Sequence, residues 1–337
     1  MTDNFPLFRL PYVALYEVLD HVGPAPILSL SLCSKRVRFI VRNYHGPLKK
    51  VNIEFDIAEC ALKVYRTTLI SVNIVSEIST HFERVTIGAH RVPVEVENGI
   101  LKTYWNDEKE GMEAITKYTL DVFNGKLRSL ISHGALSDAA VRFWIEWIKK
   151  FQKKIYRLSI WWLSTDHPDQ LTKYILESDF VTGDLQLQLP TSLDGWRIVP
   201  DPRSYSMDFL YLRPSNWVTL DHFLTMDIKS IYLRKTHLTC QDVNVFLKRW
   251  INGECSKRIK EVSLDMGIEF DVLFNDIEVT RRDFNVKRRY VGYRRIEVIV
   301  GGFDIRRKSH GAMATIMNKH GELEILFWPD YKGNPYH

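Results

Sequence analysis

The side chains that could do chemistry are scattered along this chain and form no known catalytic pattern. The sequence has no GxSxG nucleophile turn, no GxxxxGK[ST] phosphate loop, no GxGxxG and no HExxH. Its eleven histidines are dispersed, and no pair stands beside Cys or Asp at metal-ligand spacing. We therefore predict that the protein is not an enzyme and has no catalytic residues, no metal site and no cofactor.

Three segments come closer to a binding or bridging motif, but each lacks a required part. The acidic run DVLFNDIE (271–278) lacks the glycine and the terminal Glu of a calcium loop. Gly301-Gly302 follows a strand pattern, yet no helix pattern opens after it, so a turn fits better than a phosphate loop. Cys240 and Cys255 stand at opposite ends of a helix pattern, which favours free thiols over a disulfide.

The composition is that of an ordinary globular protein. The 337 residues are 45% hydrophobic and 26% charged, and no apolar run approaches the roughly 18 residues that span a bilayer. The first ten residues do not read as a signal peptide. The four cysteines show no CxxC, and there is no Asn-x-Ser/Thr site. We expect an intracellular protein, cytoplasmic or nuclear or both, with no membrane partner.

A basic stretch interleaved with aromatic residues lies late in the chain. The net charge is +5, and KRRYVGYRR (287–295) and RRK (306–308) contribute much of the excess. One interpretation is a patch for nucleic acid or an acidic partner. The other is a solvated edge strand whose arginines deter edge-to-edge pairing. We favour the edge strand, because the overall charge is small and no nucleic-acid-binding motif accompanies the stretch.

The elements that must position any site alternate between short strands and helices. Strand patterns of the form apolar-x-x-apolar-x-apolar recur at Leu48-Val51-Ile53, Phe82-Val85-Ile87, Ile155-Leu158-Ile160, Met207-Leu210-Leu212, Ile228-Ile231-Leu233 and Ile259-Val262-Leu264, with weaker ones at Leu127-Leu130 and Leu185-Leu187. From residue 127 their spacing of about 20 to 30 residues is typical of leucine-rich-repeat-like α/β units. A compact doubly wound α/β domain is the alternative.

Helix patterns separate these strands. We predict helices over 137–154, with Ser137 as N-cap, over 168–177, and over 239–253, where Thr239 and Asp242 have capping-box spacing and Gly253 ends the helix. The first of these helices places Val141, Trp144, Ile145, Ile148 and Phe151 on one face. For Trp144 and Trp147, three residues apart, we favour core packing over a stacking platform. The last forty residues contain Gly-rich breaks between short strand patterns and predict an antiparallel hairpin or meander.

Residues 10–44 belong to no α/β unit and predict three short helices. The first carries an apolar stripe of Leu15, Val18, Leu19 and Val22; the second covers 26–32, and the third begins near Ser34. So small a bundle offers more apolar surface than its helices can cover among themselves. From the residues alone, this surface either binds a partner or caps the end of the repeat array.

The segment LPYVALYEVLDHVGPAPILSLSLCSKRVRFIV (10–41) resembles an F-box. It opens with Leu10-Pro11 and contains a Cys33-Ser34-Lys35-Arg36 junction, followed by Val37 where many F-boxes have Trp. The residues of this segment are most similar to those of the large nematode family of F-box proteins that carry an F-box-associated domain. TCQDVNVFLKRWINGECSKRIKEVSL (239–264) and GFDIRRKSHGAMATI (302–316) resemble motifs of that second domain.

The resemblance implies a two-part architecture and a set of partners. The fold class is α/β, with a small three-helix F-box at 1–45 and a leucine-rich-repeat-like domain at 46–337 that ends in the antiparallel hairpin or meander. The F-box is expected to dock on a Skp-type adaptor and, through it, on a cullin–RING ubiquitin ligase. The residues expected to face the adaptor are Leu10, Pro11, Leu15, Val18, Leu28, Leu30 and Leu32.

The repeat domain is then expected to bind an unknown target protein on the sheet face that its helices leave uncovered. Strand alternation predicts that this face carries Ser159, Trp161, Gln186, Gln188, Tyr211, Arg213, Tyr232, Arg234, Ser263 and Asp265. Because neighbouring side chains of a strand point to opposite faces, at least one of Trp161 and Trp162 is expected to lie on that uncovered face. The alternative function is a basic nucleic-acid-binding module that uses the N-terminal helices; a hydrolase ranks third.

Overall fold

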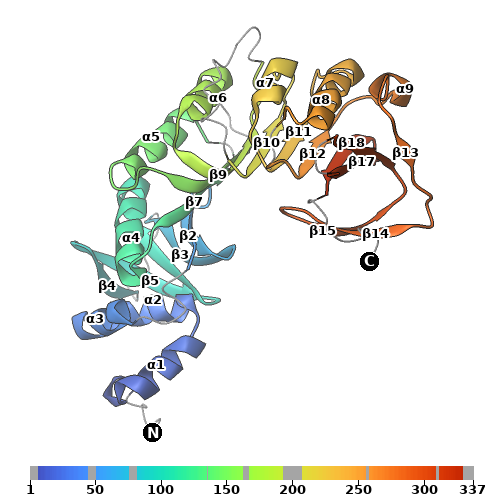
Figure 1. The fold of residues 1–337 in the computed structure, drawn as a ribbon. Coiled ribbons are helices and arrows are strands. Elements are labelled where there is room, and N and C mark those ends of the chain that lie inside the picture. Colours follow the sequence, from blue (N-terminus) through green and yellow to red (C-terminus); the bar gives the residue numbers. More distant parts are fainter. Residues whose placement is uncertain are drawn as a thin grey trace. The chain divides into compact units, whose positions relative to one another are not determined.

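The computed structural model describes residues 7–44, 51–75, 82–134, 136–161, 167–192, 207–255, 258–308 and 311–328. Its contacts divide the chain into two compact units, Met1–His133 with Lys150–Ile155, and Gly134–Lys149 with Tyr156–His337. Two residues of the expected strand patterns, Leu48 and Trp162, lie outside the described residues. Figure 1 shows the elements of both units in chain order.

The first unit begins with the three predicted helices. They are α1 (Tyr12–His21), α2 (Pro24–Cys33) and α3 (Lys35–Asn43), preceded by the 3-10 turn η1 (Leu7–Arg9). Pro24 occupies the first turn of α2, where its missing N–H costs nothing. Ser34 caps α3 by accepting a hydrogen bond from the Val37 amide. The N-terminal helices therefore form where local sequence signals place them.

A mixed sheet and one long helix complete the first unit. The strand order is β7-β1-β2-β3-β6-β5-β4, in which β1 pairs with β7 and β3 pairs with β6 in parallel. The strands are β1 (Ile53–Asp56), β2 (Ala61–Val64), β3 (Thr67–Ile74), β4 (Glu83–Ile87), β5 (His90–Glu97), β6 (Ile100–Trp105) and β7 (Leu127–His133). The predicted strand at 82–87 thus belongs to an antiparallel ladder with β5, and not to a repeat unit.

The helix α4 (Glu108–Phe123) packs on this sheet and was not predicted. Asp107 caps it, and Asn124 ends it in the left-handed conformation. At Gly111 the helix comes so close to the sheet that a Cβ atom would lie 2.7 Å from the Trp105 ring. A glycine is therefore required at this contact.

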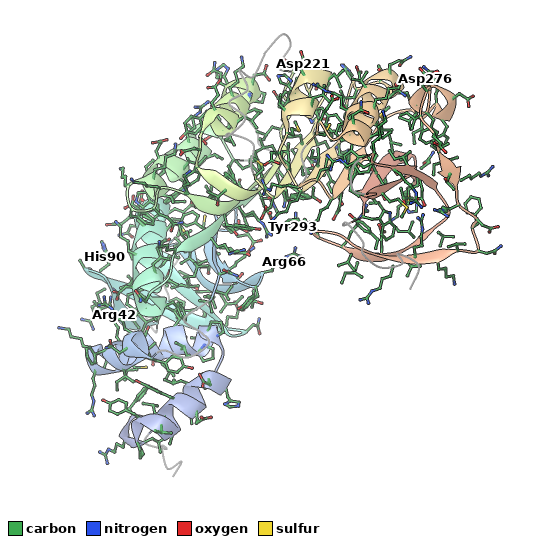
Figure 2. All side chains as sticks on the ribbon, viewed as in Figure 1. Arg42, Arg66, His90, Asp221, Asp276 and Tyr293 are labelled. Atoms are coloured by element: carbon green, nitrogen blue, oxygen red, sulfur yellow. The ribbon has the colours of Figure 1, made fainter. Side chains whose placement is uncertain are left out.

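Two of the N-terminal helices pack on α4 within the same unit. Ser31 on α2 is hydrogen-bonded to the Tyr118 hydroxyl at 2.9 Å. Arg38 and Arg42 on α3 contact the carboxylate of Asp121 at 2.6 and 3.3 Å, and Arg42 is labelled in Figure 2. Part of the apolar surface of the small bundle is thus covered from inside the chain. The division at residue 45 stays a prediction.

The second unit contains the predicted succession of α/β repeats. Its strands follow one another in the order β8-β9-β10-β11-β12, and β9 to β12 pair in parallel. They are β8 (Ile155–Trp161), β9 (Val181–Gln188), β10 (Phe209–Arg213), β11 (Ser230–Leu233) and β12 (Glu261–Leu264). This sequential order differs from a doubly wound sheet, whose strand order reverses at a switch point. The leucine-rich-repeat-like prediction is therefore confirmed over the alternative.

Helices line one side of these parallel strands, as Figure 1 shows for α6, α7 and α8. The helices of this unit are α5 (Asp138–Lys149), α6 (Pro168–Glu177), α7 (Leu220–Thr225), α8 (Cys240–Asn252) and the short α9 (Phe270–Leu273). The capping box of Thr239 with Asp242 and the left-handed Gly253 are both present at α8, as predicted. The expected helix over 137–154 ends earlier, at Lys149, and Phe151 is exposed.

Antiparallel strands close the second unit at its C-terminal end, as predicted. The strands β13 (Thr280–Arg281), β16 (Phe303–Arg306), β17 (Met313–Lys319) and β18 (Glu322–Phe327) form a ladder that joins β12 through β18. The strands β14 (Lys287–Val291) and β15 (Ile296–Val300) form a separate hairpin. This hairpin contains the basic stretch KRRYVGYRR, with Gly292 to Arg295 at its tip.

Candidate functional site

The N-terminal helices of the first unit present apolar side chains to solvent. Tyr12, Val13 and Val18 on α1 are 66, 78 and 36% exposed, and Phe39 on α3 is 68% exposed. Isolated exposed apolar residues are common on soluble proteins, whereas several on one small helical bundle indicate an interface. This set is the first candidate binding surface.

The seven residues expected to face an adaptor are distributed between surface and core. Pro11 and Val18 are exposed, and Leu10, Leu30 and Leu32 are half-buried. Leu15 and Leu28 are 1 and 0% exposed, because they pack inside the first unit. In this structure these two side chains support the helices and offer no surface to a partner.

Sequence reasoning missed the three most exposed apolar residues of this region, Tyr12, Val13 and Phe39. Tyr12 and Val13 lie off the stripe that was assigned to the first helix. An apolar residue off the core stripe of a short amphipathic helix was the available signal. Phe39 stands among Arg36, Arg38 and Arg42 on the charged side of α3, where it is equally out of place for a core residue.

The second candidate surface is the side of the repeat sheet that faces away from the helices. The side chains that alternate along the strands with those of this face point to the helices and are buried: Leu185, Leu210, Ile231 and Val262. This confirms the predicted alternation. The strand register aligns side chains of this face in rows across β9 to β12. One row is Gln186, Tyr211, Tyr232 and Ser263, and the row before it is Asp184, Phe209, Ser230 and Glu261.

The predicted residues of this face differ in how much of them a target could reach. Arg213 and Asp265 are exposed, and Trp161, Gln186, Gln188, Tyr211, Tyr232 and Arg234 are half-buried. Ser159 and Ser263 are 3 and 1% exposed, so they present almost no surface. The rings of Trp161 and Tyr211 are stacked with their centroids 6.0 Å apart. This stacked pair is an aromatic feature of the face.

The tip of the β14–β15 hairpin lies on the row that contains Asp184, Phe209 and Glu261. The hydroxyl of Tyr293, labelled in Figure 2, is hydrogen-bonded to that of Tyr156 on β8. Arg294 stands over the Phe209 ring, 4.1 Å from its centroid, and lies 3.5 Å from Asp184. The predicted hairpin was expected only to close the C-terminal end. It also covers the row that contains Asp184 and Glu261.

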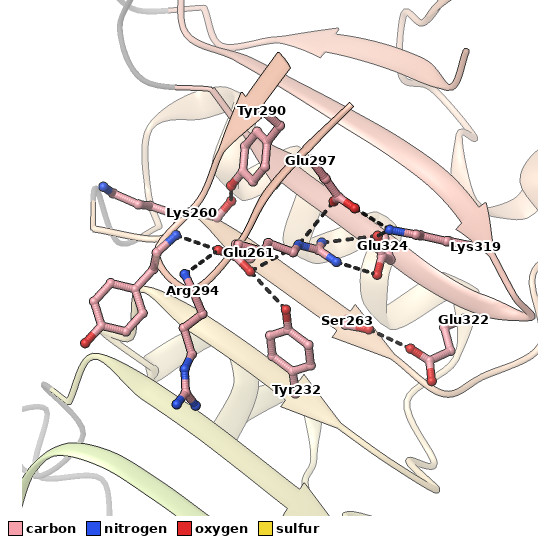
Figure 3. Close-up of polar contacts among 12 residues, drawn as sticks. Tyr232, Lys260, Glu261, Ser263, Tyr290, Arg294, Glu297, Lys319, Glu322 and Glu324 are labelled. Carbon is pink, nitrogen blue, oxygen red and sulfur yellow. Dashed lines mark hydrogen bonds and ion pairs between the residues drawn. The ribbon is translucent and has the colours of Figure 1, made fainter. Parts of the chain in front are cut away.

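Glu261 is the carboxylate that holds the tip in place (Figure 3). It is fully buried, and it accepts hydrogen bonds from the backbone amides of Tyr293 at 2.6 Å and Arg294 at 3.4 Å. The Tyr232 hydroxyl donates to its other oxygen at 2.9 Å. Burial, with the nearby Glu261 charge, raises the pKa of Tyr232, which keeps this phenol protonated as the donor.

The arginines of the basic stretch mostly neutralise acidic residues of the same unit. Arg295 makes a bidentate contact with Glu324 at 2.9 and 3.1 Å. Arg288, which is 1% exposed, contacts both oxygens of the buried Asp304 at 2.9 Å. Such buried pairs fix the geometry of the strand that contains them. The stretch includes an edge strand, β14, as the favoured interpretation expects, but Arg288 and Arg295 are paired inside the unit and not solvated.

The described residues contain no group of three or more His, Cys, Asp or Glu side chains that could hold a metal ion. No helix in the described ranges is long and apolar enough to cross a membrane. The cysteines in these ranges are free thiols, and burial with the neighbouring Glu108 raises the pKa of Cys60 to about 12. At neutral pH this thiol is therefore not a nucleophile.

Comparison with known families and proteins agrees with the geometry. Residues 7–46 match the F-box domain, and residues 204–264 match the F-box associated family. The chain is 22% identical, over 98% of its length, to E3 ubiquitin-protein ligase hecw-1 of Caenorhabditis elegans, of which it spans 29%. It is 22% identical to the C. elegans protein F59B2.8 over 76% of its own length and 60% of that protein, and 21% identical to F59B2.9 over 96% and 79%. No solved structure is significantly similar to the chain.

Proposed function

Because the chain is an F-box protein of the nematode family, with an F-box-associated domain, we propose that it is a substrate-recognition subunit of an SCF-type ubiquitin ligase. Its N-terminal helices dock on a Skp-type adaptor, which links them to the cullin and the RING subunit. The second unit binds the target protein. The chain itself catalyses no step: it raises the effective concentration of target lysines near the ubiquitin-loaded enzyme.

The observation that supports adaptor docking most is the exposure of Tyr12, Val13, Val18 and Phe39 within the segment that matches the F-box domain. An adaptor that covers such side chains gains about 1.5–3 kcal/mol for each one that becomes fully buried. A few central residues then dominate the affinity. Leu15 and Leu28 serve the same interface indirectly, since their burial fixes the position of α1 and α2.

For the target we propose the part of the sheet face that the hairpin tip leaves open. Its features are the stacked Trp161 and Tyr211, the amides of Gln186 and Gln188, and the exposed Arg213. Aromatic rings beside amides and an arginine are the side chains that most often anchor a protein partner. Tyr232 and Arg234 are committed to Glu261 and to Ser263 and Glu322, so they shape the face more than they bind.

Membership in the ligase can be tested without knowing the target. The purified chain is added to a reconstituted adaptor–cullin–RING complex with a charged ubiquitin-conjugating enzyme, and ubiquitin on the chain's own lysines is measured by mass spectrometry. A chain that docks through its F-box is held near the transferring enzyme and becomes modified. The Val18→Asp variant, which places a charge in the docking surface, is expected to lose most of this modification.

The matched control is Val245→Asp on α8, because Val245 is 40% exposed and lies in the second unit. It makes the same chemical change outside the docking surface and is expected to be modified like the wild type. If the wild type stays unmodified while a known F-box subunit is modified in the same mixture, the proposed function is wrong. Equal modification of the wild type and Val18→Asp contradicts the proposed docking surface.

A further inference from the structure

The second strand of the hairpin has an unprotected edge. Within the described chain, β15 pairs only with β14, and its register places Arg289 opposite Val298 and Lys287 opposite Val300. The Gly292 amide donates to the Arg295 carbonyl, so the backbone groups of alternate residues, including Val298 and Val300, point away from β14. Proteins usually blunt such an edge with lysine, proline or a bulge. The β15 sequence IEVIV contains no lysine or proline, and its one charged side chain, Glu297, pairs with Arg295 and Lys319.

An apolar groove of about 550 Å³ runs beside this edge. Three consecutive residues of β15, Val298 to Val300, form part of its wall. The other apolar side chains come from the segments around it: Phe270, Phe284, Phe303 and Met317. Phe284 and Val298 are 66 and 61% exposed, which is unusual for side chains of this size. The groove is thus built to bury apolar groups of something other than the described chain.

The charge around the groove is positive and incompletely neutralised. None of its lining residues is acidic, whereas Arg281, Arg282 and Lys319 are basic. Arg282 pairs with Asp304, and Lys319 with Glu297. Three further cations are exposed, and no acidic residue of the described ranges pairs with them. They are Arg281, in the lining of the groove, and Lys287 and Arg289, on the adjoining outer face of β14. Three cations therefore remain available to a ligand next to an apolar groove.

We propose that this groove binds an extended segment of a partner protein that carries apolar and acidic side chains and pairs with the free edge of β15. Main-chain hydrogen bonds to the edge would supply affinity, as in other cases where a peptide adds a strand to a sheet. Apolar side chains would enter the groove between Phe284 and Met317. Carboxylates would meet Arg281 and the cations of β14. The surface is separate from the Trp161–Tyr211 face and does not depend on adaptor docking.

Two other occupants fit the observations less well. A second copy of this chain, paired through the same edge, would offer these cations only the strand IEVIV, whose one carboxylate, Glu297, already pairs with Arg295 and Lys319. Nucleic acid requires many phosphate contacts, and most arginines of the basic stretch are already paired inside the unit. An apolar groove also has little to offer a phosphate backbone.

The test uses a displayed library of random ten-residue peptides, selected against the purified full chain. The peptides that are enriched are expected to combine acidic and apolar residues. A synthetic copy of the strongest peptide is then titrated, by fluorescence anisotropy, against the wild type and two variants. Arg289→Glu reverses an exposed charge, and Val298→Pro removes an edge N–H that the hairpin does not use. Each is expected to weaken binding by about tenfold or more.

Lys153→Glu is the control for the charge change, because Lys153 is exposed outside the second unit, and it is expected to bind like the wild type. Circular dichroism shows whether Val298→Pro has folded; Arg289→Glu keeps the test decisive if it has not. The inference is overturned if no peptide is enriched, if the enriched peptides lack acidic residues, or if Arg289→Glu binds them unchanged. It is also overturned if the chain dimerises through β15, or if duplex DNA binds more tightly than the peptide.

Discussion

Gly292 at the hairpin tip shows how one residue can decide whether a surface is covered. A Cβ atom at this position would lie 2.1 Å from the Glu261 carboxylate oxygen, far inside any allowed contact. Only a glycine lets the backbone come close enough for the amides of Tyr293 and Arg294 to bind that carboxylate. Because Glu261 is fully buried, losing these donors would leave its charge with only the Tyr232 hydroxyl and the Arg295 guanidinium, 3.5 Å away, as partners.

We therefore expect Gly292→Ala to destabilise the protein by about 1–3 kcal/mol, the cost of an unsatisfied buried polar group. The free energy of unfolding in urea measures this change. The matched control is Gly267→Ala, where a new Cβ would meet no atom within 4 Å. Equal stabilities of the two variants would show that the tip does not depend on the close approach at Glu261.

Residue identity alone could not separate buried from exposed apolar positions in the N-terminal helices. Leu15 and Leu28 are buried, and Tyr12 and Val13 are exposed. For Leu28 the burial depends on tertiary packing, because α2 packs on the sheet and on α4. That helix is more than 60 residues further along the chain and was not predicted from the sequence. The practical consequence is that Leu28→Asp would test folding, whereas a charge at Val13 tests docking.

Elements with strong local signals were predicted accurately, and those without them were missed. The helix over 168–177 was predicted with its observed bounds, and α8 within one residue at each end, because Pro168, Thr239 and Gly253 mark their ends. In α4 the buried residues Met112, Ile115 and Val122 do follow helical spacing. Gly111, Thr116 and Thr119 are buried among them, which weakens the apolar pattern in the sequence. Its packing is decided by close contact with the sheet.

The helix α7 contains a cap that titrates. The ring nitrogen Nδ1 of His222 accepts a hydrogen bond from the Thr219 amide at 3.1 Å, and it can do so only when it is unprotonated. Burial lowers the pKa of His222, although Asp221 and the Trp217 backbone oppose the shift. Protonation thus both charges a buried ring and removes the cap.

The direction of the pH effect follows from this lowered pKa. Above the ordinary histidine pKa of about 6.5, both folded and unfolded states are neutral and the full stability is present. As the pH falls through that value, the unfolded state takes up the proton first, so the free energy of unfolding decreases. We expect His222→Gln, whose amide oxygen can still accept the capping bond, to show a smaller decrease between pH 7 and 5, measured by urea titration at each pH.

The exposed His237 provides the control for this measurement. His237→Gln makes the same substitution outside the α7 cap, while His133, whose pKa burial also lowers, maintains a part of the pH dependence in every variant. If His222→Gln and His237→Gln give the same curve as the wild type, the cap on α7 does not titrate in this range.

At the scale of the whole molecule, the repeat pattern predicted the second unit because each repeat is formed by residues that are close together in the sequence. Strand alternation placed Gln186, Tyr211 and Tyr232 on one face, and the register confirms it. What covers that face could not be predicted, because the contact between Tyr156 and Tyr293 joins residues 137 positions apart. The complementary charges of the hairpin and the sheet are visible only once the strands are in place.

The two units account for the proposed division of labour within one chain. The first presents exposed apolar side chains on its N-terminal helices, and the second presents the Trp161–Tyr211 face and the groove beside β15. Variants in either unit should therefore affect different partners. The free-energy effects of two such variants should add when they are combined, because the two sites share no contacts.

The most direct test of this account is the mass of the complex formed when the purified chain is mixed with a Skp-type adaptor, measured by size-exclusion chromatography with light scattering. We predict a 1:1 complex for the wild type and for Val245→Asp, and none for Tyr12→Asp combined with Val13→Asp, whose exposed positions leave the circular dichroism spectrum unchanged. A wild-type chain that elutes apart from the adaptor, or a double variant that binds it as well as the wild type, would contradict the account.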